Sequence, residues 1–408
     1  MNHSPLPPVL RAFALAFAVL AACGSGPDPS TTGGDTSGVL VTGVSSYVGS
    51  AVVDTQGQVL LTADEALDVV RFPPAVPLGS NWGAPANQPN IELALSGSTV
   101  WWASNDGNNS TLWSSPEASI ATPTTTGIGF PGLVGSDVIG LVADATGVYA
   151  AVSAPETPPP GTLPPILGPS PDSWQWPGSP AVDTPFSGSI YRIVPGATPT
   201  VTPLAPTGGI TFFPGFMQHV LAQSSTEVYW VDSTPVAPDL ARVMAASKAD
   251  WATDPGHAVG AIKPVSGLPT GFVGLAANDD YVAWVVAPEP NPGTAGCWVW
   301  SSKKDGAPVE IFDSDLVATP FSCNGLAIDD TYAYIAMVQV YVPPAGVDSD
   351  VLLGTGIARV PLVGGPLETA SLQTDRWYGP RRVLVDDTYA YAIDPYYVVR
   401  FPKTDFAP

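Results

Sequence analysis

The chain has 408 residues and a net charge of −22, with 14 basic against 36 acidic side chains. A field of this sign repels phosphate backbones and anionic headgroups, which argues against nucleic-acid binding and against peripheral attachment to an acidic membrane surface. Hydrophobic residues make up 45%, too many for a disordered chain, while 47 prolines and 41 glycines interrupt long helices. These figures together predict an all-β protein with many turns.

The first 22 residues have the composition of an export signal peptide. One cation, Arg11, precedes the apolar run 12–22, which is too short to span a bilayer. The run ends in Leu-Ala-Ala-Cys, with the cysteine at position 23, and resembles the lipobox of bacterial lipoproteins. The resemblance implies cleavage before Cys23, lipidation of its thiol, and a lipid-anchored protein of the cell envelope. The alternative is an ordinary signal peptide with an incidental cysteine.

Residues 23–38 are expected to act as a flexible tether. Positions 24–38 hold only Gly, Ser, Pro, Asp and Thr, a composition that cannot bury apolar surface. Gly24 stands where the sorting pattern of the lipoprotein family would place Asp for retention in the inner membrane. The resemblance therefore implies the outer membrane as the destination.

One unit recurs along the rest of the chain: an apolar strand, a turn of Asp, Ser or Asn, and a strand with an aromatic residue. Short polar side chains bond to their own backbone in turns, and the alternation of apolar residues predicts strands. The seven turn positions are Asp54, Ser96, Asp144, Ser224, Asn278, Asp329 and Asp386. The residues five positions later, expected to point into the core, are Val59, Trp101, Tyr149, Tyr229, Ala283, Tyr334 and Tyr391.

A third strand follows each pair where it can be recognised, and it carries an arginine at one repeat position. The stretch 238–254 has some helical spacing, but its match to the other copies favours a strand. The arginines could form a ring of cation sites, although pairing with carboxylates across strands is the simpler interpretation. The arginines concerned are Arg71, Arg192, Arg242, Arg359 and Arg400.

The spacing of the turns predicts a β-propeller. Successive turn positions lie 42 to 57 residues apart except for one interval of 80, close to the length of a four-stranded blade, about 40 to 50 residues. Radial sheets bury both faces against their neighbours and leave short edges. We predict seven blades, with six or eight as alternatives. The last repeat ends at Pro402 after three strands, so the segment 39–44 is expected to supply its fourth strand and close the ring.

The tetrapeptide Tyr229-Trp230-Val231-Asp232 resembles the signature of YWTD-type propellers, and the Asp-Asp-Thr-Tyr copies at 329–332 and 386–389 are similar to repeats of bacterial surface lipoproteins of unassigned function. The resemblance spans residues 52–402. It departs from the family pattern in having Val231 in place of Thr and a ring predicted to exceed six blades. It implies protein recognition by one face of the propeller.

The 80-residue interval contains a Pro-rich insertion, residues 154–186, which is the candidate binding element. Loops of this length without structure of their own are usually functional or disordered. At its centre lie Asp172, Trp174 and Trp176, whose indoles could bind a partner or a sugar ring, or could pin the loop to the barrel. The insertion joins a second to a third strand, so we expect it on the face that carries loops 288–296 and 343–354.

Beyond Cys23 the chain holds two cysteines, Cys297 and Cys323. A pair in an exported protein favours a disulfide over a metal site, and no histidine lies near either in sequence. The predicted blades place both at the same face, at a third strand and at the first strand of the next blade, which makes a bridge between neighbouring blades plausible.

The other motifs give little evidence of a catalytic, phosphate-binding or metal site. His219 and His257 lie in different repeats, so neither a histidine metal site nor a catalytic triad is expected. The stretch 127–132 fits G-x-G-x-x-G, but its proline and flanking residues predict a loop rather than a phosphate-binding helix. The segment 104–110 and the pair Asp313 and Asp315 could bind calcium, yet a hairpin turn is the simpler interpretation of the first. We therefore expect no cofactor.

The sequence favours a lipid-anchored envelope module that binds a protein or glycan. The alternatives are a propeller enzyme, such as a hydrolase or a calcium-dependent polysaccharide lyase, and a structural component of the envelope. An enzyme should gather polar groups with perturbed pKa values at the mouth of the central channel, whereas a binding module should show an aromatic patch on the loop face.

Overall fold

The computed structural model divides the chain into two units, Met1–Thr36 and Ser37–Pro408. The residues it describes all lie in the second unit: 48–54, 59–63, 68–72, 76–79, 93–105, 110–117, 128–129, 137–153, 186–196, 198–204, 210–212, 220–232, 242–261, 270–288, 296–304, 306–314, 321–341, 351–372, 382–393 and 398–408. The expected signal peptide, Cys23, the tether and the closing strand 39–44 lie outside these ranges. Within them, no helix is long and apolar enough to cross a membrane.

The described residues form seven antiparallel sheets, called sheets 1 to 7 in chain order. Sheets 1 and 2 contain β1 (Val48–Val53), β2 (Val59–Ala63), β3 (Asp68–Phe72) and β4 (Val76–Gly79), then β5 (Leu93–Ser96), β6 (Thr99–Asn105), β7 (Ser110–Pro116) and β8 (Ile128–Gly129). Sheets 3 and 4 contain β9 (Asp137–Asp144), β10 (Gly147–Ser153), β11 (Phe186–Val194), β12 (Thr200–Pro203) and β13 (Ile210–Phe212), then β14 (Leu221–Gln223), β15 (Glu227–Asp232), β16 (Arg242–Ser247) and β17 (His257–Ala261).

Sheets 5 and 6 contain β18 (Thr270–Ala277), β19 (Tyr281–Pro288), β20 (Trp298–Lys303) and β21 (Val309–Asp313), then β22 (Phe321–Ile328), β23 (Tyr332–Tyr341), β24 (Val351–Pro361) and β25 (Glu368–Leu372). Sheet 7 contains β26 (Arg382–Val385), β27 (Tyr389–Ile393) and β28 (Val398–Pro402), and a 3-10 helix, η4 (Lys403–Asp405), follows it. The strand at 242–247 confirms a strand rather than a helix in the stretch 238–254.

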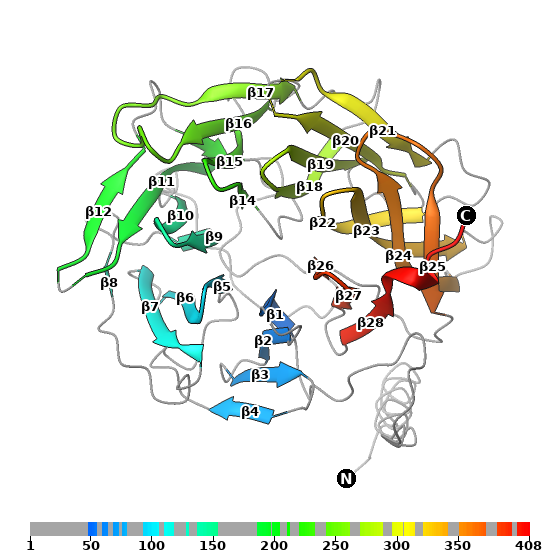
Figure 1. Cartoon of the computed structure of the whole chain (residues 1–408), viewed down its shortest axis with the longest axis horizontal. Helices are drawn as coiled ribbons and strands as arrows, with labels where there is room; N and C mark the ends of the chain where they lie inside the picture. Colours follow the sequence, from blue (N-terminus) through cyan, green and yellow to red (C-terminus); the bar gives the residue numbers. More distant parts are fainter. Residues whose placement is uncertain are drawn as a thin grey trace, which may run out of the picture. The chain divides into compact units, whose positions relative to one another are not determined.

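Each sheet is a meander in which strands pair in chain order, except that β13 pairs with β11, and the sheets are arranged around a centre (Figure 1). The first strand of every sheet contacts the first strand of the next, from β1 through β5, β9, β14, β18 and β22 to β26, and β26 contacts β1. Radial sheets with their first strands innermost define a β-propeller. The predicted all-β propeller is therefore confirmed.

The core lies between the sheets. The seven largest fully buried side chains come one from each second strand: Leu60, Trp102, Tyr149, Trp230, Trp284, Tyr334 and Tyr391. In sheets 1, 2, 4 and 5 this residue lies one position beyond the predicted one, yet Val59, Trp101, Tyr229 and Ala283 are buried as well. The alternation of apolar residues could not predict which of two successive side chains is the larger buried one, because each second strand packs against a neighbouring sheet on both faces.

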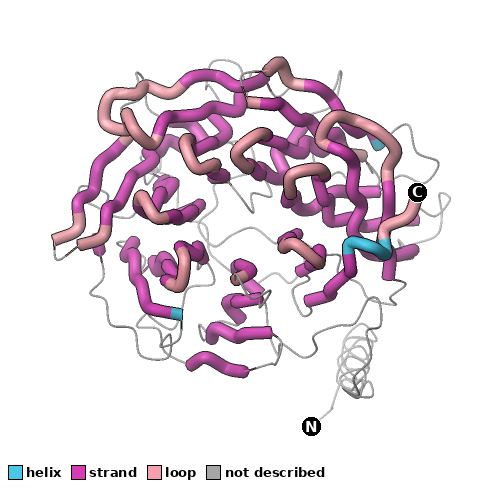
Figure 2. Tube along the Cα trace, viewed as in Figure 1, coloured by secondary structure: helices cyan, strands magenta, loops and turns pink. Residues whose placement is uncertain are grey.

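The predicted turn residues hold the hairpins between first and second strands. Oδ1 of Asp329 accepts hydrogen bonds from the backbone N–H groups of Thr331 and Tyr332, both at 2.8 Å. Asp386 binds two backbone N–H groups in the same way, and Asp144, Ser224 and Asn278 also accept from backbone N–H groups in their turns. Figure 2 shows these turns around the centre of the ring. We call the side that carries them the turn face and the opposite side the loop face.

The third-strand arginines share one register position in four sheets rather than five. Arg71, Arg192, Arg359 and Arg400 stand directly opposite Leu60, Tyr149, Tyr334 and Tyr391. Arg242 lies opposite Asp232 instead, and Ala245 faces Tyr229. The prediction for Arg242 was wrong because strand β16 is shifted by three residues relative to the alignment, a shift that a three-residue match could not detect.

The insertion joins β10 to β11, so it leaves from the loop face as predicted. Its second boundary moves by one residue, because Phe186 begins β11. The segment 127–132 contains the short strand β8 at Ile128–Gly129, the fourth strand of sheet 2. Strands β6 and β7 pair from Thr99↔Pro116 to Asn105↔Ser110, which confirms a hairpin at 104–110.

Candidate functional site

Four residues of sheet 3 form a polar socket on the turn face: Asp144 at the end of β9, Tyr149, Arg192 and Thr202. Strand pairing sets them side by side, since Tyr149 is opposite Arg192 and Arg192 is opposite Thr202. The tyrosine hydroxyl lies 2.9 Å from Thr146 Oγ1, which in turn donates to Asp144 Oδ1 at 2.6 Å. The socket is the product of the Asp, Tyr and Arg positions that the repeat pattern revealed.

Sheet 4 fills this socket with Lys248, which is only 4% exposed. Its Nζ donates to Asp144 Oδ2, to Gln223 Oε1 at 3.0 Å and to the carbonyl of Ser224 at 2.5 Å. Arg192 Nη1 donates to the carbonyl of Lys248 at 3.0 Å. All three ammonium protons therefore have acceptors, and the lysine links two sheets rather than offering a free amine.

An aromatic residue three positions after this lysine completes the contact. The ring of Trp251 meets the ring of Tyr149 edge to face at 5.0 Å between centroids. Its Nε1 donates to the carbonyl of Thr202 on β12 at 3.1 Å. The indole is 2% exposed, so the aromatic side chain seals the outer part of the socket.

Sheet 6 repeats the socket with Asp329, Tyr334, Arg359 and Thr369. Tyr334 Oη donates to Asp329 Oδ2 at 2.8 Å. Arg359 bonds to Glu368 through Nε at 2.6 Å, the pairing of arginine with a cross-strand carboxylate that the sequence suggested. Asp329, Tyr334 and Arg359 occupy the positions held in sheet 3 by Asp144, Tyr149 and Arg192. Glu368 stands at the position of Thr202, and Thr369 is the next residue, opposite Ala358.

Residues Lys403–Ala407, called the strap, fill the second socket from sheet 7. Lys403 Nζ donates to Asp329 Oδ2 at 2.7 Å, and Arg359 Nη1 donates to the carbonyl of Lys403 at 2.8 Å. Phe406 lies edge to face on Tyr334 at 5.7 Å, with the Arg359 guanidinium 4.7 Å from its centroid. Thr369 and Ala407 pair as an isolated bridge, with N–O distances of 2.7 and 3.3 Å.

These contacts shift the pKa of the socket residues. Burial alone would raise the pKa of Asp329, but hydrogen bonds from Lys403, from two backbone N–H groups and from Tyr334 lower it overall. The pKa of Asp144 is likewise lowered against its burial, chiefly by Lys248 and Thr146. Burial and the bond to Asp329 raise the pKa of Tyr334. The carboxylates are therefore held ionised and the tyrosines neutral.

The turns of sheets 4 and 5 are also linked to neighbouring sheets. Asp279 Oδ1 accepts the backbone N–H of Ser225 at 2.7 Å, which lowers the pKa of Asp279. Lys304 Nζ bonds to Thr226 Oγ1 at 2.5 Å, and Asn278 Nδ2 donates to the carbonyl of Asp329 at 2.9 Å. Asp144, Lys248, Asp279, Lys304, Asp329 and Lys403 thus hold neighbouring sheets together on the turn face.

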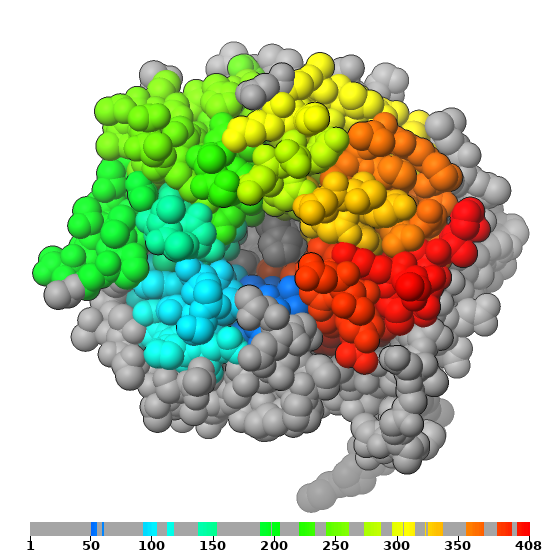
Figure 3. All heavy atoms as spheres, in the orientation of Figure 1, coloured from blue at the N-terminus to red at the C-terminus, as the bar shows by residue number. Residues whose placement is uncertain are grey.

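A buried arginine joins the last sheet to the first two. Arg382, which begins β26, is 4% exposed and donates through Nη1 to Ser50 Oγ on β1 at 3.0 Å. The same hydroxyl oxygen accepts the N–H of Leu93 on β5 at 3.1 Å. Figure 3 shows the ring hollowed at its centre, between the first strands. The polar contact therefore ties three innermost strands where sheet 7 meets sheet 1.

The loop face gives the base of the insertion an additional support. Ser153 pairs with Gly188 in the β10–β11 ladder, and β13 pairs with the first residues of β11, from Phe186↔Phe212 to Gly188↔Ile210. Among the seven sheets of the described part of the chain, sheet 3 is the one with a fifth strand. This strand pins the returning end of the insertion.

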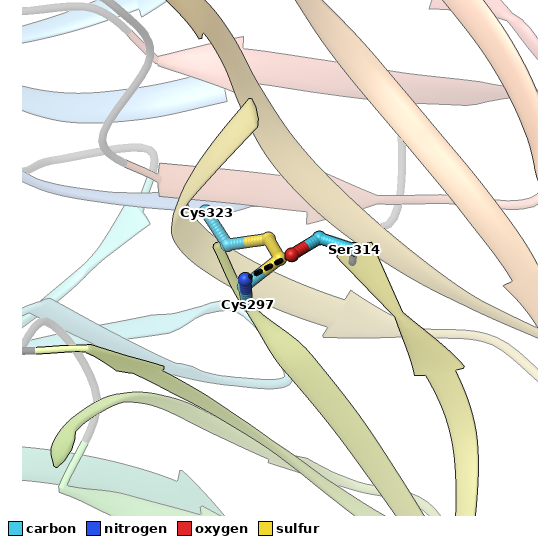
Figure 4. The surroundings of a disulfide bond; sticks show 3 residues. All are labelled: Cys297, Ser314 and Cys323. Carbon is cyan, nitrogen blue, oxygen red and sulfur yellow. Dashed lines mark hydrogen bonds between the residues drawn. A yellow bond between two sulfur atoms is a disulfide. The ribbon is translucent and has the colours of Figure 1, made fainter. Parts of the chain in front are cut away.

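Sheets 5 and 6 are joined at the same face by a disulfide. Cys297 precedes β20 and Cys323 lies in β22, with Cα atoms 5.9 Å apart. Ser314 Oγ accepts the N–H of Cys297 at 2.6 Å (Figure 4). The structure therefore places the two cysteines as the sequence predicted, at a third strand and at the first strand of the following sheet.

Several predicted residues lie outside the described ranges: Asp172, Trp174 and Trp176 in the insertion, His219, and Asp315. His257 is a 60% exposed residue on the edge strand β17, with Nε2 3.6 Å from Glu227 Oε1. Asp313 ends β21. Over the described ranges, no group of three or more His, Cys, Asp or Glu side chains is placed to hold a metal ion.

Sequence reasoning missed the residues that fill the sockets. A four-residue motif could have revealed them. It directly follows the third strand of sheet 4 as Lys248-Ala-Asp-Trp251 and the third strand of sheet 7 as Lys403-Thr-Asp-Phe406. Each follows its β-strand directly, and each places a cation and an aromatic ring three residues apart. The motif was hidden because its partners come from the preceding sheet.

Comparisons with known proteins support the fold. No protein-family profile matches the chain, and no curated protein sequence does. A catalytically inactive variant of virginiamycin B lyase from Staphylococcus aureus, solved with quinupristin, aligns over 90% of this chain and 98% of its own at 12% identity, with a TM-score of 0.50. The β-propeller domain of the trilobed protease from Pyrococcus furiosus aligns over 81% and 86% at 9% identity, with a TM-score of 0.44. At 12% identity, the match to the lyase variant shows a shared fold and no more.

Proposed function

We propose that the chain is a lipid-anchored cell-envelope β-propeller whose loop face binds a protein or a glycan. The observation that carries this proposal is the contrast between the two faces. The first turns of sheets 3 to 6 are engaged in bonds between sheets, whereas residues 154–185, between β10 and β11, leave from the loop face, where β13 supports their base. A loop that only connects two strands does not need the support of β13, whereas a binding loop is positioned more precisely when its base is rigid.

The anchoring part of the proposal rests on the lipobox resemblance at Cys23 and on the polar tether 23–38. A diacylated cysteine holds a protein at the membrane, and a flexible chain of this length lets the propeller stand away from it. We infer the outer membrane from Gly24. Incorporation of labelled palmitate into the parent chain, lost in Cys23→Ser, is the expected result; equal labelling of both would contradict it.

We also propose that the seven sheets are the blades of one ring and that residues 39–44 complete sheet 7. The support is that sheet 7 has three strands among the described residues, while the other six have four or more. An added strand beside β28 would give the backbone groups of its outer edge hydrogen-bond partners and would hold the two ends of the propeller together. Replacing Val41 by Pro, which cannot donate to a ladder, is expected to lower the melting temperature by several degrees.

The test of the binding function is capture from the cell envelope. The soluble fragment 39–408 is crosslinked to envelope extract beside a version lacking residues 156–185. Specific capture that disappears with the insertion is the expected result, provided that both versions melt cooperatively. Equal capture by both versions would show that the insertion is not part of the binding site. Capture by neither would favour the enzyme alternative, for which calcium-dependent stability and glycan turnover are the next measurements.

A further inference from the structure

The same socket occurs twice and holds the same kind of ligand both times. Sheet 3 binds Lys248 and Trp251, and sheet 6 binds Lys403 and Phe406. Two occurrences with matching contacts indicate that Asp, Tyr and Arg in this arrangement recognise a lysine followed three residues later by an aromatic ring. We propose that the sheet 6 socket is a peptide-binding site which the strap occupies, and from which a partner-protein segment of the same chemistry can displace it.

Each part of the socket matches one part of such a segment. Asp329 accepts the ammonium group, and the Tyr334 ring lies 5.5 Å from that nitrogen and meets the aromatic edge. Arg359 donates to a backbone carbonyl and covers the aromatic ring. Thr369 supplies an N–H and a carbonyl for a short extended stretch. The socket thus recognises the ammonium group, the aromatic ring and the backbone of the ligand.

The strap is held less firmly than its counterpart in sheet 3. Lys403 is 20% exposed, against 4% for Lys248. Soon after Trp251 the sheet 4 segment continues into β17, which is laddered to β16, whereas the strap makes one isolated bridge and η4 has no side-chain cap. Displacement of the strap therefore breaks no strand ladder. Because the chain supplies the strap at millimolar effective concentration, a competing segment needs high local concentration or better contacts.

The test uses the full chain carrying Lys403→Ala and Phe406→Ala, which loosens the strap and leaves the socket intact. The probe is the synthetic peptide Lys-Thr-Asp-Phe-Ala-Pro at about 10 mM, well above the affinity expected for so small a contact. We expect hydrogen exchange in β25 to speed up at least tenfold in the variant and to return towards the parent rate with the peptide. A control peptide with Ala for Lys and for Phe should have no effect, nor should the active peptide alter the parent.

The proposal is overturned if the variant keeps slow exchange in β22–β24, which shows that it is folded, and β25 still exchanges rapidly with the peptide present. If the double variant does not fold, the unmodified chain decides. The strap and β25 should then exchange at least tenfold faster than β22–β24, as a separable unit does. Exchange of all these segments at one common rate would mean that the strap is part of the core and not a ligand.

Discussion

At the scale of single residues, one lysine and one carboxylate decide how two sheets meet. Lys248 is almost completely buried, and its three acceptors satisfy a charge whose desolvation lowers its pKa. Removing Lys248 takes the cation from Asp144, which is 25% exposed, and the ammonium donor from Gln223 Oε1 and the Ser224 carbonyl, which costs more than the loss of an exposed pair. Lys304, 35% exposed, offers the matched exposed case on the same face.

Lys248→Ala is therefore expected to lower the free energy of unfolding by about 3 kcal/mol, while Lys304→Ala lowers it by less than 1 kcal/mol. Urea denaturation followed by tryptophan fluorescence measures both values. Equal effects of the two substitutions would show that burial of the Asp144–Lys248 pair does not matter for stability.

Asp329 gives a pH dependence with a definite sign. Its pKa in the folded chain is lowered below the ordinary value of 3.8, so the stability it contributes is fully present above that value. That stability is lost as the pH falls through the folded pKa. Asp329→Asn should be less stable than the parent at pH 7, and the difference should shrink below about pH 4. Denaturation curves at pH 7, 5 and 3 test this, and a difference that stays constant down to pH 3 would contradict it.

The repeat positions predicted most of the socket but not its ligand. Asp329, Tyr334 and Arg359 follow from turn chemistry, alternation and recurrence, all of which are local in sequence. Lys403 acts on a turn 74 residues away. Such a contact depends on which sheet lies beside which, and that neighbour relation emerges only when the ring is assembled.

At the scale of elements, close approach between first strands and covalent linkage between sheets set the stability of the ring. A Cβ on Gly140 of β9 would collide with the Val220 side chain of sheet 4, so this strand must carry glycine. Gly196, in the turn after β11, has no neighbouring atom nearer than 3.8 Å to the same position.

Gly140→Ala should destabilise the protein by about 1–3 kcal/mol, because an extra methyl group in a packed contact forces the strands apart. Gly196→Ala should change the stability by less than about 0.5 kcal/mol. Thermal or urea unfolding of both variants measures the contrast. Equal stability of Gly140→Ala and Gly196→Ala would contradict the predicted collision at Gly140.

The disulfide closes a loop of 26 residues between sheets 5 and 6. From the chain entropy of the unfolded state, its removal should cost about 3–4 kcal/mol. The double variant Cys297→Ala and Cys323→Ala should show this loss in urea, and a reducing agent should destabilise the parent but not the variant. A variant as stable as the parent would show that packing alone holds these sheets.

Strand order and turn positions could be predicted because each sheet is a local meander, and the turn residues recur along the chain. The fifth strand β13 could not be predicted: its three residues lack a pattern, and their partner at Phe186 lies beyond the insertion's far end. The shift of Arg242 was missed for a related reason, since register depends on cross-strand packing rather than on a short match.

At the scale of the whole molecule, the two faces differ in their contacts. Hydrogen bonds and ion pairs between sheets lie on the turn face, whereas the base of the insertion and the disulfide lie on the loop face. The ring provides a rigid support on which a long loop can be held without strain on the core. We therefore propose that the main partner binds at the loop face.

Site-specific photocrosslinking in living cells tests this assignment most directly. A benzophenone amino acid is placed in the full-length chain at Thr211 on β13, on the loop face, and in a second version at Asp280, in the turn before β19 on the turn face and outside the sheet 6 socket. We expect a discrete adduct from the Thr211 position, lost when residues 156–185 are deleted, and none from the Asp280 position. An adduct from Asp280 alone, or from Thr211 regardless of the insertion, would contradict recognition by the loop face.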